Sequence, residues 1–276
     1  MSARARPPHR DGRPPAASSY REYTPSDTLL PFVECFWTRE VSLPGDVGEP
    51  PVQHRVLPDG CIDVVSTFSE RGDEPESAMV VGTMTRALVL DPASDPECFV
   101  GVRFRPGKAT AFLALPASEL TDLRVAISDV WPDAERIRDA LAASPNAVAR
   151  VRALERVLTA RLTPEAIGAQ RDVDEAVRRI VEAGGSLGIT RLAPSLGVSR
   201  QHLARRFAQL VGVSPKTFAR VVRLSRVVER VRVVPPGEPV NWSALALELG
   251  YYDQSHLVDE FKEMTGVTPT AWRCPG

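Results

Sequence analysis

The chain lacks the long apolar segments that mark membrane-spanning and secreted proteins. None of its apolar runs reaches about eighteen residues, the length that a membrane-spanning helix needs. The basic N-terminus also lacks the apolar core of a secretory signal peptide. We therefore expect a cytoplasmic protein with no membrane partner.

Cysteine and histidine are also scarce, with four of each in 276 residues. The cysteines lie far apart without a Cys-x-x-Cys pair, so the spacing typical of metal sites is missing. Cys61 and Cys98 sit in apolar, strand-like runs without a neighbouring base that would activate a thiol. The sequence thus predicts no enzyme, no metal and no cofactor. A redox-sensing pair among Cys35, Cys61, Cys98 and Cys274 stays open as an alternative.

A surplus of positive charge is missing too, because the net charge is −1. The charges are unevenly spread, however, and a length of 276 residues suggests two domains. Residues 172–276 carry 14 Lys and Arg against 11 Asp and Glu, which gives +3. Residues 1–171 carry 20 against 24, which gives −4. Any nucleic-acid binding must therefore depend on where individual arginines lie rather than on bulk charge.

A duplicated pattern occupies the C-terminal third of the chain. Residues 192–220 contain Leu-Ala, Leu-Gly, His-Leu, Phe and Gly-x-Ser-Pro in that order, and residues 245–273 repeat this order with Thr-Pro in place of Ser-Pro. Such self-similarity indicates two copies of one structural unit. Each copy is typical of a short helix that ends at a glycine, followed by a second helix that also ends at a glycine.

Two helices joined by a tight glycine turn form a helix-turn-helix, whose second helix fits the major groove of DNA. In the first unit Ser199 is a natural N-cap, and Leu203 and Phe207 recur at the spacing of a buried helix face. Arg and Gln on the opposite face are the side chains that pair with guanine and adenine edges. The alternative is a solvated face of an ordinary helical bundle. The predicted DNA-facing residues are Arg200, Gln201, Ala204 and Arg205 in the first unit, and Gln254, Ser255, Asp259 and Lys262 in the second.

The region from about Val173 to Arg273 resembles the DNA-binding domain of AraC/XylS-type transcription regulators. The run Gly-Tyr-x-Asp-Gln-Ser-His-Leu-x-x-x-Phe-Lys, which begins at Gly250, is the most specific part of this resemblance. The resemblance implies two helix-turn-helix units joined by a long helix, expected here from Ser214 to Val231, and binding to double-stranded DNA. Asp259 departs from the family, which usually has a basic or polar residue there. An acid at this position could accept a hydrogen bond from a cytosine amino group or weaken phosphate contacts.

Residues 20–165 predict a mainly β domain. Short runs of β-branched and aromatic residues, separated by turn residues, suggest a small barrel or sandwich. The stretch Val56 to Val65 is typical of a strand, a Pro-Asp-Gly turn and a second strand. Helices are expected from Lys108 to Leu115, from Asp133 to Leu141 and from Pro145 to Leu162, and residues 1–19 are expected to be a disordered basic tail.

Residues Leu57 to Gly60 and Gly101 to Gly107 resemble poorly characterised sensor domains that precede some AraC-type DNA-binding domains. The resemblance implies an effector or partner site in this half. Arg103 and Arg105 alternate with apolar residues, so they are expected on one strand face, where they could bind an anionic effector. His54 is a further candidate contact. The alternative for both arginines is a solvent-exposed face with salt bridges.

Together these patterns predict an α+β protein: a mainly β, barrel- or sandwich-like sensor domain with flanking helices (20–165), followed by an all-α domain of two helix-turn-helix units joined by a long helix (172–276). The expected function is regulation of transcription, for example activation, through sequence-specific binding to double-stranded DNA. RNA polymerase, a small-molecule effector and a second copy of the chain are further expected partners. The alternative is a degenerate helix-turn-helix protein that serves as a protein-interaction module.

Overall fold

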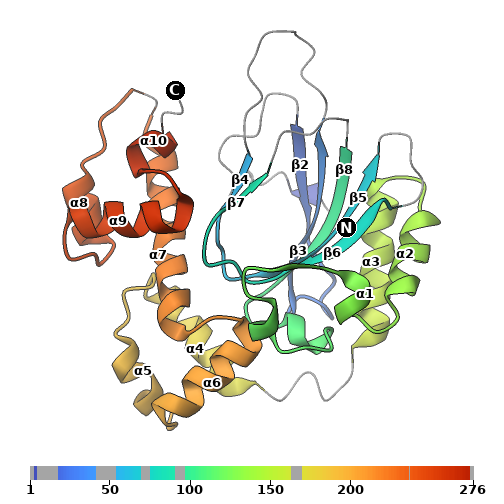
Figure 1. Cartoon of the computed structure of the whole chain (residues 1–276), viewed down its shortest axis with the longest axis horizontal. Helices are drawn as coiled ribbons and strands as arrows, with labels where there is room; N and C mark the ends of the chain where they lie inside the picture. Colours follow the sequence, from blue (N-terminus) through green and yellow to red (C-terminus); the bar gives the residue numbers. More distant parts are fainter. Residues whose placement is uncertain are drawn as a thin grey trace.

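The structure, a computed structural model, describes residues 3–4, 18–41, 54–69, 75–90, 97–162, 170–235 and 237–273. Most of the predicted tail (1–19), most of the predicted linker between the two halves and Cys274 lie outside these residues. We call residues 18–162 the N-terminal domain and residues 170–273 the C-terminal domain. The first is built mainly of strands, and the second is helical (Figure 1).

A seven-stranded antiparallel sheet forms the centre of the N-terminal domain. In β5, side chains at every second position are buried, among them Ile62, Val64 and Phe68, while Asp63 points to the other face. This alternation is what a pleated strand with apolar residues at every second position produces. In spatial order the strands are β1 (Ala3–Arg4), β2 (Ser18–Tyr23), β3 (Val33–Val41), β8 (Glu97–Phe104), β5 (Ile62–Ser69), β6 (Ser77–Val81) and β9 (Arg124–Ala126).

A separate two-stranded sheet pairs β4 (His54–Val56) with β7 (Leu88–Leu90). The turn predicted at Pro58–Gly60 is present, with Gly60 at φ 78°. The strands on either side of the turn do not pair with each other, because β5 pairs with β6 and β8 instead of β4. The physical reason lies at Leu57, which packs into the core of the C-terminal domain and draws β4 toward that domain.

Helices cover one face of the large sheet at the far side from the C-terminal domain (Figure 1). The helices predicted at 133–141 and 145–162 are confirmed as α2 (Ala134–Ala142) and α3 (Ala147–Arg161). The helix predicted from Lys108 to Leu115 is wrong, because only the short 3-10 turn η1 (Ala109–Ala111) forms. Phe112 turns into the core against Trp131, and the Ala114 N–H bonds to the Val130 carbonyl instead of continuing a helix. Two further short elements precede α2, namely η2 (Ala117–Leu120) and α1 (Ile127–Val130).

The C-terminal domain contains the two predicted helix-turn-helix units. α7 (Pro215–Arg232) joins them and contributes to both apolar cores, with Phe218 in the first and Leu224 in the second. The sequence alone predicts that Val177, Ile180 and Val181 point inward. For Val181 this is wrong, because it is 49% exposed while Ala176 and Ile180 form the buried face of the helix. The first unit comprises α4 (Arg171–Glu182), α5 (Ile189–Ser195) and α6 (Arg200–Val211), and the second comprises α8 (Trp242–Glu248), α9 (Gln254–Thr265) and α10 (Pro269–Arg273).

The ends of α6 and α9 show why the duplicated sequence folds twice in the same way. The Ser199 side chain accepts a hydrogen bond from the His202 N–H at the start of α6, and Asp253 does the same for His256 at the start of α9. Both helices end at a glycine with positive φ, a conformation that glycine adopts without strain. In the described part of the chain, every helix is too short or too polar to cross a bilayer.

Candidate nucleic-acid interface

The second helix of the first unit, α6, presents a polar face to solvent. Leu203 and Phe207 are buried in the domain core. The four residues predicted to face DNA lie on the opposite side of the helix, because residues three and four apart share a face. All four are exposed: Arg200, Gln201, Ala204 and Arg205.

The second helix of the second unit, α9, repeats this arrangement. Leu257 and Phe261 are buried, and the four predicted residues Gln254, Ser255, Asp259 and Lys262 are exposed. Counted from the N-caps Ser199 and Asp253, the two faces can be superimposed position by position. Gln254 then corresponds to Arg200, Ser255 to Gln201 and Asp259 to Arg205. The second unit therefore has an acid where the first has a guanidinium.

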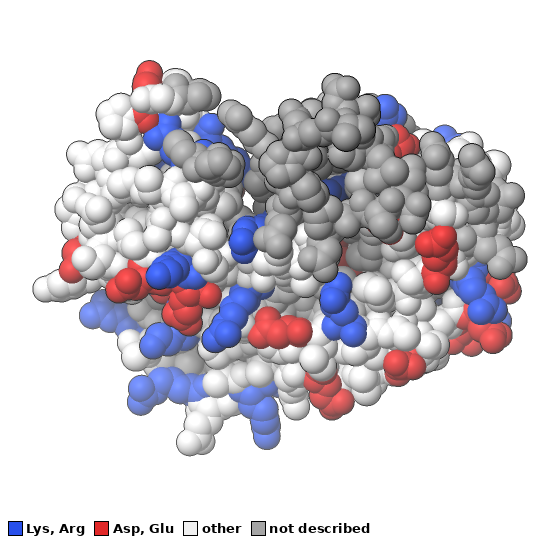
Figure 2. All heavy atoms as spheres, turned by 45° about the horizontal axis from the view of Figure 1, so that its top comes forward, with Lys and Arg blue, Asp and Glu red and all other residues white. Residues whose placement is uncertain are grey.

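The two units also differ in local charge. Residues 189–211, which form α5, the turn and α6, contain four arginines and no Asp or Glu. The matching residues 242–265 contain one lysine and five acids. Figure 2 shows Lys and Arg side chains gathered at the lower left, where the C-terminal domain lies, with Asp and Glu among them. Because DNA affinity depends strongly on neutralising phosphates, the first unit is electrostatically the better DNA-binding surface.

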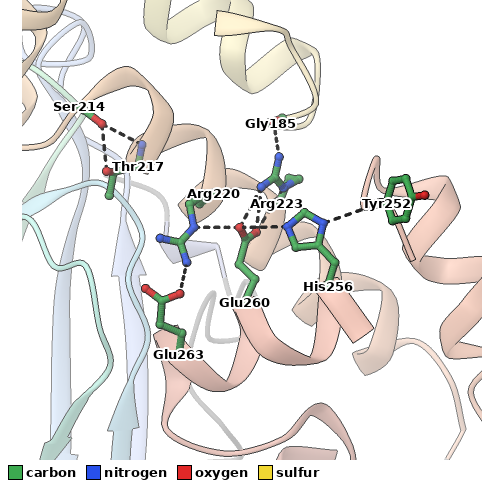
Figure 3. Close-up of polar contacts among 9 residues, drawn as sticks. All are labelled: Gly185, Ser214, Thr217, Arg220, Arg223, Tyr252, His256, Glu260 and Glu263. Carbon is green, nitrogen blue, oxygen red and sulfur yellow. Dashed lines mark hydrogen bonds and ion pairs between the residues drawn. The ribbon is translucent and has the colours of Figure 1, made fainter. Parts of the chain in front are cut away.

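Three of the five acids in the second unit are neutralised by arginines of α7. Arg220 Nε lies 2.8 Å from Glu260 Oε2, and Arg223 Nη2 lies 2.9 Å from the same oxygen (Figure 3). Arg220 Nη2 also lies 2.6 Å from Glu263, and this hydrogen bond lowers the pKa of Glu263. Arg230 pairs with Glu248. The sequence alone predicts that the arginines of α7 are solvated, and this prediction is wrong for Arg220 and Arg223.

Arg223 connects the two units directly. Besides holding Glu260, whose side chain is 6% exposed, it donates from Nη1 to the Gly185 carbonyl, 3.3 Å away, at the end of the first unit's leading helix (Figure 3). Its guanidinium also lies 5.0 Å from the centre of the Tyr251 ring. A buried carboxylate is tolerated only when it is paired and hydrogen-bonded, so this cluster fixes α9 against α7.

Two exposed apolar or aromatic side chains near α9 escaped the sequence analysis. Tyr252 is 86% exposed in the turn before α9, and its N–H donates to His256 Nδ1 (Figure 3). Leu247 in α8 is 69% exposed. The adjacent tyrosines Tyr251 and Tyr252 offered a signal, since a strand or helix rarely buries both neighbours and only Tyr251 is buried.

The three candidate effector contacts belong to different parts of the fold. Arg103 lies 3.3 Å from Asp59 and 3.3 Å from Asp63, and its side chain is mostly buried. Arg105 lies beyond the end of β8 and donates from Nε to the Leu30 carbonyl at 2.9 Å. The backbone of His54 belongs to β4, in the other sheet. Arg103 thus forms the salt bridges of the alternative, but its side chain is mostly buried instead of lying on a solvent-exposed face.

Asp63, which pairs with Arg103, has a raised pKa. Burial raises the pKa of Asp63 to about 6, although Arg103 and a hydrogen bond from Trp37 Nε1 at 2.9 Å oppose this effect. Within the described residues, no group of three or more His, Cys, Asp or Glu side chains is placed to hold a metal ion.

Comparison with known proteins places both halves of the chain. Residues 192–274 match a family described as a helix-turn-helix domain, and residues 21–126 match a domain of unknown function (DUF6597). No curated protein sequence matches the chain.

Several solved structures are similar at low identity. The C-terminal domain of AraT, a response regulator from Geobacillus stearothermophilus, is 23% identical, with a TM-score of 0.34, over 38% of this chain and 86% of that one. ToxT from Vibrio cholerae is 11% identical, with a TM-score of 0.44, over 86% of this chain and 97% of that one. Neither likeness is close enough to say what this chain binds. From the sequence match and the duplicated geometry, the chain carries a helix-turn-helix domain at its C-terminal end, behind a domain of a family whose function is unknown.

Proposed function

We propose that this protein regulates transcription by binding a specific sequence of double-stranded DNA, and that the first helix-turn-helix unit contributes most to the affinity. The observation that carries this proposal is the outer face of α6. Arg200, Gln201 and Arg205 lie exposed there, within a segment of four arginines and no acid. Arg pairs bidentately with guanine and Gln with adenine, at about 1–3 kcal/mol of discrimination for each good pair.

Contacts to the phosphates would set the position of α6 in the groove without reading sequence. The exposed start of α6 at Arg200 supports such contacts, because backbone N–H groups at a helix N-terminus favour anions. Ala204 lies between the reading side chains and would allow close approach to the bases, or contact a thymine methyl group.

We propose a weaker role for the second unit. Gln254 and Ser255 can still hydrogen-bond to base edges, and Lys262 can contact a phosphate. Asp259 can accept a hydrogen bond from a cytosine amino group, but it repels nearby phosphates. The acidic surroundings of α9 therefore predict few phosphate contacts, so this unit would add specificity more than affinity.

The N-terminal domain, with proposed boundaries at about 20 and 165, would carry the regulatory input from an effector or a partner. RNA polymerase and a second copy of the chain are the proposed macromolecular partners besides DNA, and we place the protein in the cytoplasm without an enzymatic activity. We do not favour α3 as the contact between two copies, because its apolar residues Val151, Leu154 and Leu158 are already buried in the core of their own chain.

Selection of bound duplexes from a random pool at defined salt tests this proposal. We expect an enriched motif with a strong block and a weaker block about one helical turn, roughly 34 Å, apart. Enrichment of a single block would restrict base reading to the first unit. If no sequence is enriched and affinity does not depend on salt, the protein-interaction alternative replaces DNA binding.

A further inference from the structure

The loop from Thr83 to Ala87, which we call the strap, lies between β6 and β7 of the N-terminal domain and against the C-terminal domain. It reaches the C-terminal ends of both second helices of the helix-turn-helix units. The strap therefore bears on how the two units are held relative to each other.

At its first residue the strap contacts the end of α6. The buried Thr83 hydroxyl donates to the Val211 carbonyl at 2.5 Å, and Thr121 donates to the next carbonyl, that of Gly212. The approach is close, because a Cβ on Gly212 would lie only 2.9 Å from Thr83 Oγ1. These contacts occupy carbonyl groups that the last turn of a helix leaves without an intrahelical partner.

At its last residue the strap contacts the end of α9. The Ala87 N–H donates to the Met264 carbonyl at 2.7 Å, and Ala87 packs against the apolar core of the second unit. Arg55, in the neighbouring strand β4, donates to the Thr265 carbonyl at 3.4 Å. The C-terminal turns of α6 and α9 are therefore bonded to opposite ends of the same short loop.

The length of the strap limits the distance between these helix ends. Four residue steps, from Thr83 to Ala87, span at most about 14 Å even when fully extended. The loop is also anchored at its centre. Asp122 accepts hydrogen bonds from the N–H and the hydroxyl of Thr85, both at 2.6 Å, and its own N–H donates to the Thr83 carbonyl at 3.0 Å. The centre of the strap is thus anchored to the N-terminal domain.

We propose that the strap is a specificity determinant: by fixing the C-terminal ends of α6 and α9, it sets which spacing between the two DNA blocks the protein accepts. This inference rests on the proposed function. α7 joins the units along its length, and the strap adds a second attachment at the C-terminal ends of α6 and α9, which restricts how far the units can tilt. A protein that is already held in its bound geometry loses less conformational entropy when it binds. It also binds more weakly to a duplex whose second block lies at the wrong spacing.

The test variant is Asp122→Gly, which removes the anchor of Thr85. Asp122 has φ 57°, in the left-handed region that glycine adopts without strain, so this change removes the carboxylate without straining the backbone. Asp133→Gly is the matched control. Asp133 has φ 64° and lies at the start of α2, away from the strap.

The first readout needs no DNA. Gln209 in α6 and Lys262 in α9 are each replaced by a keto-bearing amino acid that carries a spin label. The two labels report the distance between the helices. We expect a broader distance distribution for Asp122→Gly than for the wild type, and no change for Asp133→Gly. An unchanged distribution in Asp122→Gly overturns the inference.

The second readout uses duplexes whose two blocks are moved closer or further apart by one or two base pairs. We expect the preference of the wild type for its best spacing to fall by about fivefold or more in Asp122→Gly. An equal spacing preference in both proteins overturns the inference. Tighter binding by Asp122→Gly at every spacing also overturns it, because the strap would then inhibit binding instead of selecting a spacing. If the wild type binds none of the duplexes, the proposed function fails and the spacing role fails with it. The label distances still show whether the strap holds the helices.

Discussion

At the scale of single residues, the contrast between Arg205 and Asp259 is the most informative feature of the reading surface. Both lie six positions after the N-cap of their helix, and both are exposed. One can donate two hydrogen bonds to guanine, and the other can only accept. The same fold therefore presents opposite charges at matching positions of the two helices that we propose to enter the groove.

Arg205→Ala tests the first of these contacts. We expect DNA binding to weaken by about 1–3 kcal/mol and specificity to relax at one base position, because a bidentate base contact is lost. Parallel selections with the wild type and the variant measure both effects. Arg138→Ala, which removes an exposed arginine from the N-terminal domain, is the control. Equal affinity and an unchanged motif in Arg205→Ala would mean that α6 reads DNA through another face.

Asp63 gives a pH prediction in the N-terminal domain. Its carboxyl ionises near its ordinary pKa of 3.8 in the unfolded chain and near 6 in the folded protein. Between these pH values the folded state binds the additional proton, so the free energy of unfolding falls as pH rises, by about 1.4 kcal/mol per pH unit. Above pH 6 this contribution is lost. Urea unfolding between pH 4 and 7 should show the fall in the wild type relative to Asp63→Asn, and parallel pH profiles would contradict it.

At the scale of elements, the attachment of α9 to α7 depends on one buried carboxylate. Glu260→Ala leaves Arg220 and Arg223 partly buried without their shared partner, which should cost about 3–5 kcal/mol in the free energy of unfolding. Glu263→Ala removes a neighbouring acid of the same helix whose side chain is 55% exposed, and should cost less than about 1 kcal/mol. Denaturant midpoints of the two variants give the comparison. Similar losses in both would show that Glu260 is not the anchor of α9.

At the scale of the whole molecule, the two domains share apolar packing as well as the strap. Leu57 of the N-terminal domain is buried in the core of the second unit with Val221 and Leu224. Across the same interface, Gly60 lies against the ring of Phe218. The N-terminal domain therefore contributes to the stability of the helices proposed to bind DNA.

Leu57→Ala tests this shared core. We expect a loss of about 2–5 kcal/mol, as for other buried leucines, with faster hydrogen exchange in α8 and α9 although the change lies in the other domain. Leu141→Ala in α2 is the control, since Leu141 is buried in the core of the N-terminal domain alone. If hydrogen exchange in α8 and α9 accelerates equally in both variants, Leu57 does not specifically stabilise the second unit.

Much of the C-terminal domain was predictable because its signals are local. N-caps such as Ser199, helix-ending glycines and apolar residues at helical spacing all act within one or two turns of the chain. They predicted both helix-turn-helix units, and they placed the polar outer faces of α6 and α9 correctly. What these faces do with DNA stays a prediction.

The errors occurred where distant contacts override local preference. The stretch after Lys108 has the composition of a helix, but burial of Phe112 against Trp131 ends it after one turn. Arg223 has the composition of a solvated helix face, but Glu260, 37 residues further along the chain, pairs with it. Neither partner is visible in the neighbouring sequence.

The sequence by itself determined the duplicated helix-turn-helix, because caps and periodicity act over a few residues. Only the tertiary structure decided how the two units are joined to the N-terminal domain. The strap holds α6 and α9 through the carbonyl groups of Val211 and Met264, and every residue in a chain carries such a group. The partners of these bonds, Thr83 and Val211 for example, are 128 residues apart, so no local pattern selects them. Their pairing follows from the path of the folded backbone.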